Sequence, residues 1–471
     1  MELSKGRFLR LVFLVFFAIL TSISSKAQLH DDPSVADSGT LRSKLIRNGI
    51  FHAHARSFFM ATDNRNPLTD YFAWGVGAGI GYESPIWKNF QFAVTGFFIF
   101  NLASSDLSQI DSLAKAGNRY EIGLFDITNP HNKSDLDRLE NLYLRYYFPK
   151  SWIQIGRMDI HTPFLNRQDG RMRGTLEEGI WFSSKLIKPL TLEGGWIWSV
   201  SPRSTVHWYS IGKSIGVYPS GINIWGNKSQ YPGALKSLGI FTLGLGVETS
   251  KFLYIQLWNL LTENIFNTAF FELDGRIPLN DKWNLRPGFI YTRQDPWPCP
   301  SGCAVEKTYM PPGQSSNIFS SRIALERKSL RFSLNYTRIT NHGRFLMPRE
   351  WGREYFYTFM PRERSEGLGN MHAVVTRLHI PLLKGKFVPS LSYGHFYLPS
   401  VDDFRLNKYK MPSFSQLNLD LRYRFEKYLR GLTIQFLMVY KGALTETYNR
   451  PDIEFNRVRM FNWSIVVDYA F

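Results

Sequence analysis

Long apolar segments, domain linkers and cysteines are all scarce in this chain of 471 residues. After residue 20, no segment approaches the run of about 18 apolar residues that a membrane-spanning helix needs, which excludes a helical inner-membrane protein. No low-complexity block or shift in composition follows residue 48, so we expect a single domain there. The lack of any repeat of about 20–50 residues argues against a propeller or a β-helix.

The first 27 residues have the pattern of a secretory signal peptide. Three basic residues, Lys5, Arg7 and Arg10, precede the apolar run Leu11–Leu20, and Ser25-Lys26-Ala27 offers small residues at the cleavage positions. We therefore expect a signal peptide at residues 1–27, a short periplasmic lead-in at 28–48 and a barrel at 49–471. The run Leu11–Leu20 is too short for a comfortable membrane-spanning helix.

The chain is strongly basic, with a formal net charge of +17. Residues 1–27 carry four basic side chains and one acidic side chain, so removing them leaves +14. Export disfavours nucleic acid as the partner. Two explanations stay open, namely contact with anionic lipid headgroups and a cation-lined pore that attracts anionic solutes.

The only cysteines, Cys299 and Cys303, lie in a segment rich in proline and glycine. In an exported protein, two close cysteines in such a segment favour one local disulfide. A metal or redox site would need more ligands or a different setting.

Alternating side chains are the main positive signal. In 462–471, Trp463, Ile465, Val467, Tyr469 and Phe471 occupy every second position, and mostly small or polar residues fill the gaps. Successive side chains of a strand point to opposite faces, so one face is apolar and aromatic. A strand between lipid and a water-filled interior has this pattern, and the 15% of aromatic residues suits the interfacial girdles of a barrel.

About eighteen segments show strand patterns, and tight polar turns alternate with long connections. The predicted strands are 49–60, 71–83, 88–101, 139–148, 151–159, 179–186, 189–200, 237–248, 251–260, 267–278, 282–294, 317–327, 329–338, 368–380, 386–396, 413–425, 430–441 and 458–471. Short periplasmic turns and long extracellular loops are typical of outer-membrane barrels. The sequence therefore predicts an all-β, antiparallel transmembrane barrel in the outer membrane of a Gram-negative cell.

The polar faces of these strands must point inward, because a charged side chain on the lipid face costs about 2–4 kcal/mol near the bilayer midplane. Strands 151–159 and 368–380 do not alternate cleanly, so their facing stays open. Glycines on one face of 71–83 leave room for a loop folded into the barrel. The predicted lumen residues are His52, His54, Arg56, Arg145, Glu272, Asp274, Arg276, Arg286, Arg322, Arg331, Asn335, Asn418, Asp420, Arg422 and Arg424.

Two loops are rich in arginine. The loop 160–178 carries Arg167, Arg171 and Arg173, which either narrow the barrel and bind carboxylates or are merely solvated. The loop 339–367 carries five arginines and four glutamates, so internal salt bridges compete with solute contact as its role. Another loop opens with Ser201-Pro202-Arg203, which could direct Arg203 toward the pore. Among the acidic lumen residues, Asp274 and Asp420 could hold the cationic end of a zwitterion.

Motifs that would make the barrel an enzyme are missing. There is no G-x-S-x-G, the histidines are scattered, and His52 and His54 lack an evident third metal ligand. We expect no enzyme, no metal and no cofactor. A barrel enzyme of the lipase or protease type and a non-conducting structural barrel remain the alternatives.

Several short motifs together resemble the OprD family of outer-membrane porins. They are Gly156-Arg157-Met158-Asp159, Thr162-Pro163-Phe164, Arg171-Met172-Arg173-Gly174, Ser201-Pro202-Arg203-Ser204, Arg349-Glu350-Trp351-Gly352 and Val467-Asp468-Tyr469-Ala470-Phe471, with Arg56 in the first strand. The resemblance spans about residues 45–471, and it depends on the order and spacing of the motifs rather than on any one of them.

The resemblance implies an eighteen-stranded barrel that is narrowed by inward-folded loops and takes up small solutes by selective, passive diffusion. It further implies an arginine ladder that engages the carboxylates of solutes. Carried over by position, the residues of this ladder are Arg56, Arg145, Arg171, Arg173, Arg203 and Arg349. We also expect contact with outer-membrane lipid and recognition of the C-terminal Phe471 by the barrel-assembly machinery. Monomer and trimer both remain open.

Overall fold

The computed structural model describes residues 48–168, 170–298 and 304–471. The predicted signal peptide, nearly all of the predicted lead-in and the predicted disulfide of Cys299 and Cys303 lie outside the described residues. Within the described part, no helix combines the length and the apolar character needed to cross a membrane.

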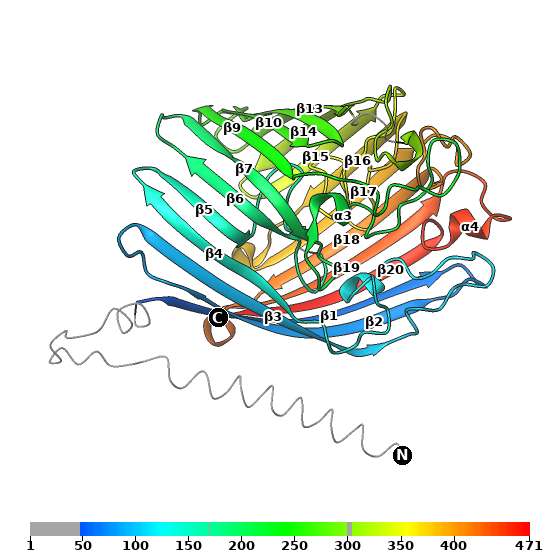
Figure 1. Cartoon of the computed structure of the whole chain (residues 1–471), viewed down its shortest axis with the longest axis horizontal. Helices are drawn as coiled ribbons and strands as arrows, with labels where there is room; N and C mark the ends of the chain where they lie inside the picture. The colour runs from blue at the N-terminus through cyan, green and yellow to red at the C-terminus, as the bar shows by residue number, and fades with distance from the viewer. Residues whose placement is uncertain (1–47, 169, 299–303) are drawn as a thin grey trace, which may run out of the picture. The chain divides into compact units, whose positions relative to one another are not determined.

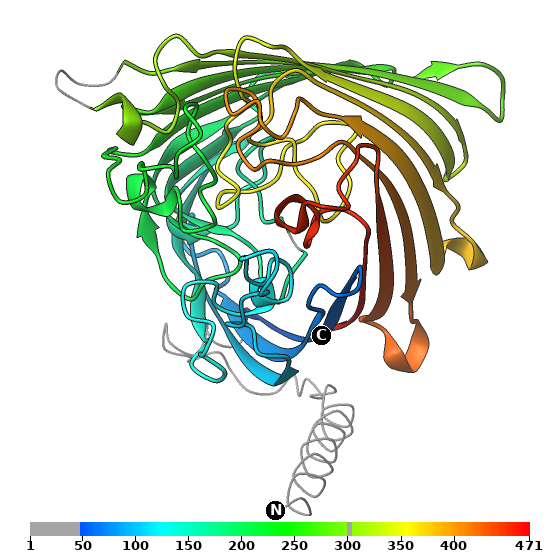
Figure 2. The same cartoon turned by 90° about the vertical axis from the view of Figure 1, so that its right-hand side faces the viewer.

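The described chain forms one antiparallel sheet that closes into a barrel (Figures 1 and 2). The ring closes where β1 (Ile50–Asn64) pairs with β20 (Met460–Ala470), with Phe58 opposite Val466. The other sixteen long strands within the described residues are β2 (Tyr71–Glu83), β3 (Phe90–Ser104), β4 (Arg138–Phe148), β5 (Ser151–Met158), β6 (Leu176–Ser184), β7 (Leu190–Ser201), β9 (Ile240–Ser250), β10 (Leu253–Thr262), β11 (Phe266–Gly275), β13 (Asn284–Pro296), β14 (Ser316–Arg327), β15 (Leu330–Ile339), β16 (Met371–His379), β17 (Phe387–Tyr397), β18 (Phe414–Arg424) and β19 (Leu432–Ala443).

The remaining elements are short. Two-residue strands, β8 (Tyr209–Ser210) and β12 (Ile277–Pro278), pair with β7 and β13. The described helical turns are η1 (Ile122–Leu124), α3 (Ile211–Ser214), η2 (Val305–Lys307), η3 (Leu383–Gly385), η4 (Lys427–Leu429) and α4 (Pro451–Glu454). The predicted closed barrel of eighteen strands is confirmed, and each predicted segment overlaps one long strand.

Long and short connections alternate with two exceptions, namely residues 65–70 between β1 and β2 and residues 263–265 between β10 and β11. Only residues 263–265 join β10 to β11, at the end of the barrel where most connections are long. Asn264 lies there in the left-handed region with a φ of 64°, which lets the chain reverse within three residues.

The wall has its apolar side chains outside. On β15, Leu334 is 50% exposed, whereas its neighbour Asn335 is 2% exposed and donates a hydrogen bond to the carbonyl oxygen of Val375. On β18, Gln416 and Asn418 are buried inside, and Gln416 donates to the carbonyl oxygen of Pro361 in an inward loop. This arrangement inverts that of a water-soluble protein, as a wall between hydrocarbon and an enclosed polar interior requires.

One of the two strands without clear alternation, β16, shows why the pattern was lost. On β16, Ala373 and Val375 are buried, because an apolar part of the loop 340–370 packs against the inner face. Met360 of that loop lies beside Val375 at Gly394. From Ala373 to Val375 the side chains on both faces of β16 are therefore apolar, so the sequence carries no period-two signal there.

A matched pair of substitutions on β19 tests the facing of the wall. Phe436→Arg places a charge on the outer face and is expected to lower the free energy of unfolding by about 2–4 kcal/mol. Gln435→Arg, one residue earlier, points into the lumen, where Gln435 donates to Asp420 at 2.9 Å, and should change stability little. Urea titration of the detergent-folded protein measures both, and equal losses would contradict the assigned facing.

The interior is partly filled by apolar clusters that the loops form with the wall. In the larger cluster, Trp351 is fully buried and stacks on Phe266 of β11 at a centroid distance of 6.0 Å. In the second cluster, Phe125 and Met172 pack near Gly75 of β2, where a Cβ atom would lie 3.1 Å from Met172 Sδ. The expectation that the glycines of β2 make room for an inward loop is confirmed at Gly75.

Candidate functional site

Four long loops narrow the lumen and position the candidate site. They span residues 105–137, 159–175, 202–239 and 340–370, and Figure 2 shows loop segments lying within the ring of strands. Each contributes side chains to one cavity, so the site is assembled from parts of the chain that are far apart in sequence.

Two buried arginines fasten these loops to one another. Arg138, at the start of β4, donates to the carbonyl oxygen of Gly174 at 2.6 Å and to Ser201 Oγ at 2.9 Å. Arg173 is 3% exposed and donates to the carbonyl oxygen of Leu136. Arg173 therefore joins loop 159–175 to loop 105–137 and does not line the cavity.

One cavity bounded by these loops has a volume of about 580 Å³. One side is the wall at β1, β18, β19 and β20. The other sides are the four inward loops together with residues of the loops 398–413 and 444–459. Its lining is dominated by arginine: Arg56, Arg119, Arg171, Arg203, Arg349, Arg353, Arg362, Arg364, Arg422 and Arg457, against the carboxylates Glu363, Asp420 and Asp468. We call this the arginine cavity.

All three carboxylates of the arginine cavity are already paired. Asp468 accepts from Arg56 Nε at 2.6 Å, and Asp420 accepts from Arg422 Nη2 at 3.0 Å. Glu363 lies 2.6 Å from Lys441 Nζ and 3.0 Å from Arg119 Nη2. The acidic side chains therefore neutralise only part of the basic lining.

Three guanidiniums in the cavity have only neutral acceptors among the described residues. Arg171 Nη1 donates to the carbonyl oxygen of Gly170 at 2.7 Å, and Arg203 Nη1 lies 3.5 Å from the carbonyl oxygen of Gln168. Arg362 donates to Asn462 Oδ1 at 2.6 Å and to Ser464 Oγ at 3.1 Å. Buried charges without a counter-charge are costly, so these side chains favour an anion beside them.

The pKa values of these loop arginines are lowered, which is consistent with a surplus of positive charge in the cavity. Burial, and then the charge of Arg362, lower the pKa of Arg171 to about 9. Burial and the charge of Arg203 lower the pKa of Arg362 to about 10. Both side chains remain charged near neutral pH, at an electrostatic cost that a bound anion would relieve.

Two buried glutamates hold the arginine-bearing part of loop 340–370. Glu363 binds Lys441 of β19 and Arg119 of loop 105–137, as given above. Glu366 accepts from Lys408 Nζ at 2.8 Å and from the Tyr409 hydroxyl at 2.7 Å, and Arg349 Nε lies 3.5 Å from it. The salt bridges expected of this loop are thus present, and several of its arginines also line the arginine cavity.

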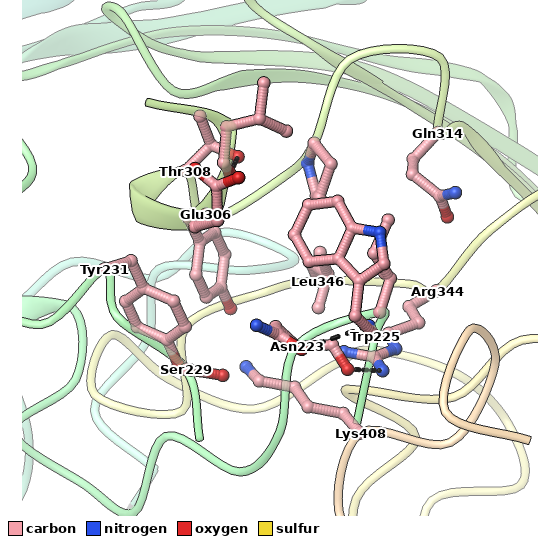
Figure 3. A pocket seen from close by; sticks show the side chains of 14 residues that line it. Asn223, Trp225, Ser229, Tyr231, Glu306, Thr308, Gln314, Arg344, Leu346 and Lys408 are labelled. Carbon is pink, nitrogen blue, oxygen red and sulfur yellow. Dashed lines mark hydrogen bonds between the residues drawn. The ribbon is translucent and has the colours of Figure 1, made fainter. Parts of the chain in front are cut away.

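Lys408 also forms the floor of a narrow pocket between the loops, drawn in Figure 3. Trp225, Tyr231 and Arg344 project into it, and Arg344 Nη2 donates to the carbonyl oxygen of Asn223 at 3.0 Å. Its volume of about 20 Å³ is near that of a single water site. This pocket is therefore part of the packing between loops rather than a solute path.

The structure gathers some of the predicted site residues and separates others. Arg56, Arg171, Arg203, Arg349, Arg422 and Asp420 all line the arginine cavity.

Arg145, Arg173, Arg424 and Asp274 do not line it. Arg145 lies against the Trp152 ring at 4.7 Å and donates to Gln154. Asp274 binds Arg286 at 2.9 Å and also Arg322, away from this cavity. Arg424 is exposed at the end of β18.

Sequence reasoning missed Arg119 and Arg457 altogether. Each is a lining arginine on a long loop without a run of basic residues around it. No spacing rule marks them, because they reach the cavity only through the folding of their loops. Among the described residues, no group of three His, Cys, Asp or Glu side chains is arranged to hold a metal.

A closed antiparallel barrel with an apolar exterior and inward-folded loops defines the class of outer-membrane channels. The model of the OprD family of outer membrane porins matches residues 109–361. The chain belongs to this family, and it is a porin of the outer membrane. The resemblance noted in the sequence is thereby confirmed.

Solved structures of other channels have the same fold. OccAB4 of Acinetobacter baumannii is 15% identical, with a TM-score of 0.68 over 90% of this chain and 98% of that one. OccK9 (OpdG) of Pseudomonas aeruginosa is 13% identical, with a TM-score of 0.70 over 91% and 99%. OccD3 (OpdP) of the same organism is 14% identical, with a TM-score of 0.67 over 94% and 96%. No curated protein sequence matches the chain.

Proposed function

We propose that this porin carries small anionic solutes, carboxylate-bearing ones in particular, by passive diffusion through the arginine cavity. The observation that supports this proposal is the set of three guanidiniums, Arg171, Arg203 and Arg362, that line one cavity without a carboxylate partner among the described residues. A guanidinium binds a carboxylate through two parallel hydrogen bonds, so each can replace part of the solute's hydration shell.

Transport also requires that the solute leave. Arginines with their own partners, such as Arg56, Arg349 and Arg422, lie around the same cavity and offer weaker, successive contacts. Binding shared over several sites lets a solute enter and be released, because no single contact holds it. The paired carboxylates Asp420 and Asp468 also line the cavity and could exchange partners with a cationic group on a zwitterionic solute.

The proposal predicts a loss of anion selectivity when the unpaired charges are removed. The double variant Arg171→Gln/Arg203→Gln should lower the anion-to-cation permeability ratio several-fold, because two uncompensated positive charges leave the lining. The reversal potential of single channels in a KCl gradient across a planar bilayer measures this ratio. Arg424→Gln, outside the cavity, is the matched control.

Four outcomes would decide against the proposal. An unchanged reversal potential in the double variant would contradict the role of Arg171 and Arg203. An equal change in Arg424→Gln would assign the effect to overall charge rather than to the cavity. Absence of any conductance would favour the non-conducting barrel, and hydrolysis of lipid by the purified protein would favour a barrel enzyme.

Two further partners, outer-membrane lipid and the barrel-assembly machinery, are proposed from the outer surface of the barrel. The exposed apolar side chains of the strands would contact outer-membrane lipid, and Phe471, which is 48% exposed, would be available to the barrel-assembly machinery. Both a monomer and a trimer are compatible with this surface.

A further inference from the structure

The three unpaired guanidiniums of the arginine cavity come from three different loops. Arg171 lies in loop 159–175, Arg203 in loop 202–239 and Arg362 in loop 340–370. Their charges act on one another. The charge of Arg362 lowers the pKa of Arg171, that of Arg171 lowers the pKa of Arg203, and that of Arg203 lowers the pKa of Arg362. All three line the same cavity, and we call this set of three positive charges the arginine triangle, or the triangle.

The donors of this triangle are only partly used. Arg171 Nε and Arg203 Nε are buried and have no hydrogen-bond partner among the described residues. The neutral acceptors of Arg362, Asn462 and Ser464, occupy two of its nitrogen atoms. Because no carboxylate among the described residues is hydrogen-bonded to these guanidiniums, a ligand that supplies several charged oxygen acceptors at once would be favoured beside them.

Among the described residues, no carboxylate accepts a hydrogen bond from a guanidinium of the triangle. Asp420, Asp468 and Glu363 have their own cationic partners, as described above. The other acidic side chain nearby, Glu121, accepts hydrogen bonds from Thr62 and from Asn118, the latter at 2.7 Å. Burial raises the pKa of Glu121, which favours its neutral form and weakens any compensation of the arginines.

We propose that Arg171, Arg203 and Arg362 form a binding site for a dianionic tetrahedral oxyanion, namely phosphate or the phosphoryl group of a small ester. A carboxylate offers one charge and two oxygen atoms in a plane, which suits one guanidinium. A phosphoryl group offers a charge of about −1.5 to −2 at pH 7 and three acceptor oxygens in different directions, which suits three guanidiniums around it. The inference rests on the proposed function, since the site lies on the proposed solute path.

The experiment is a comparison of anions as blockers of the chloride current through single channels in a planar bilayer at pH 7.5. Inorganic phosphate and glycerol phosphate should reduce the current at concentrations at least ten-fold lower than acetate or succinate. Block by both phosphates identifies the phosphoryl group as the ligand. Block by inorganic phosphate alone identifies the free ion.

Variants locate the effect within the cavity. Arg362→Gln and, independently, Arg203→Gln should raise the blocking concentration of phosphate at least ten-fold. Arg422→Gln removes a positive charge from the same cavity, but this charge is already paired with Asp420. It should therefore raise the blocking concentration of phosphate less than three-fold. Two separate variants guard against a folding defect in either.

The outcomes separate this inference from the proposed function. Acetate or succinate that blocks as well as phosphate would overturn the oxyanion site and leave an anion-selective porin. An equal effect of Arg422→Gln would also overturn it, because total charge rather than the triangle would then control block. A channel without anion selectivity and without block by any anion would overturn both.

Discussion

The Glu363→Gln variant is expected to lose about 3–5 kcal/mol of the free energy that holds loop 340–370 against the wall, because it removes one partner of a buried ion pair. Lys441 is fully buried on β19, with its Nζ 2.6 Å from Glu363 and 4.1 Å from the centre of the Phe414 ring. Without the carboxylate, that ammonium group has no counter-charge of its own. The loop should detach, and the single-channel current should become larger and noisier.

A double-mutant cycle isolates the pair. Lys441→Met alone should have a smaller effect, since Glu363 keeps Arg119 at 3.0 Å. The combined variant Glu363→Gln/Lys441→Met removes both charges and should be closer to the wild type than Glu363→Gln is. Current noise that is equal in Glu363→Gln and in the wild type would show that this ion pair does not hold the loop.

Acidification is expected to release the same loop, in a pH range set by Glu363. Burial alone would raise the pKa of Glu363, but the charges of Arg119 and Lys441 outweigh it and lower the pKa to about 2. Because the folded-state pKa is depressed, the stabilisation is complete above the ordinary value of 4.5 and is lost as the pH falls from there toward 2. The shift corresponds to about 3 kcal/mol.

Glu366 contributes in the same direction, since Lys408 and Arg349 lower its pKa against the effect of burial. Single-channel current should therefore be steady from pH 7 to about 5 and become noisy only at lower pH. Glu363→Gln should be noisy throughout this range. An onset of noise near pH 6 in the wild type would point to histidine titration instead, and would contradict the role of these carboxylates.

The wall was predictable from the sequence because its environment repeats every second residue. Lipid on one side and enclosed water on the other impose the alternation on β18, where Leu417, Leu419 and Leu421 face outward and Asn418 and Asp420 face inward. The pattern fails on β16 because its inner face packs against a loop rather than against water. The alternation in the sequence thus reflects whether lipid or water lies against each face of a strand. It is lost where a loop, rather than water, packs against the inner face.

A residue that lines the cavity was predictable only where a sequence motif or the facing of its strand determined its position. Arg56 and Arg422 follow from strand facing, and Arg171 follows from its loop motif. Arg173, two residues later, clamps the backbone of Leu136 instead, because its direction is set by how two loops pack. Such packing depends on contacts across hundreds of residues, for example Arg119 with Glu363, which no local pattern encodes.

The seam between β1 and β20 has a consequence for biogenesis. Ala53 and Phe471 exchange backbone hydrogen bonds of 2.8 and 3.0 Å, and β20 is the strand that pairs with one edge of β1, whereas β2 pairs with the other edge. That edge of β1 must therefore stay unpaired until β20 has been made and exported. An unpaired strand edge of this kind is a template for aggregation. A tag fused after Phe471 should therefore interfere with ring closure more than an insertion of equal length in an extracellular loop.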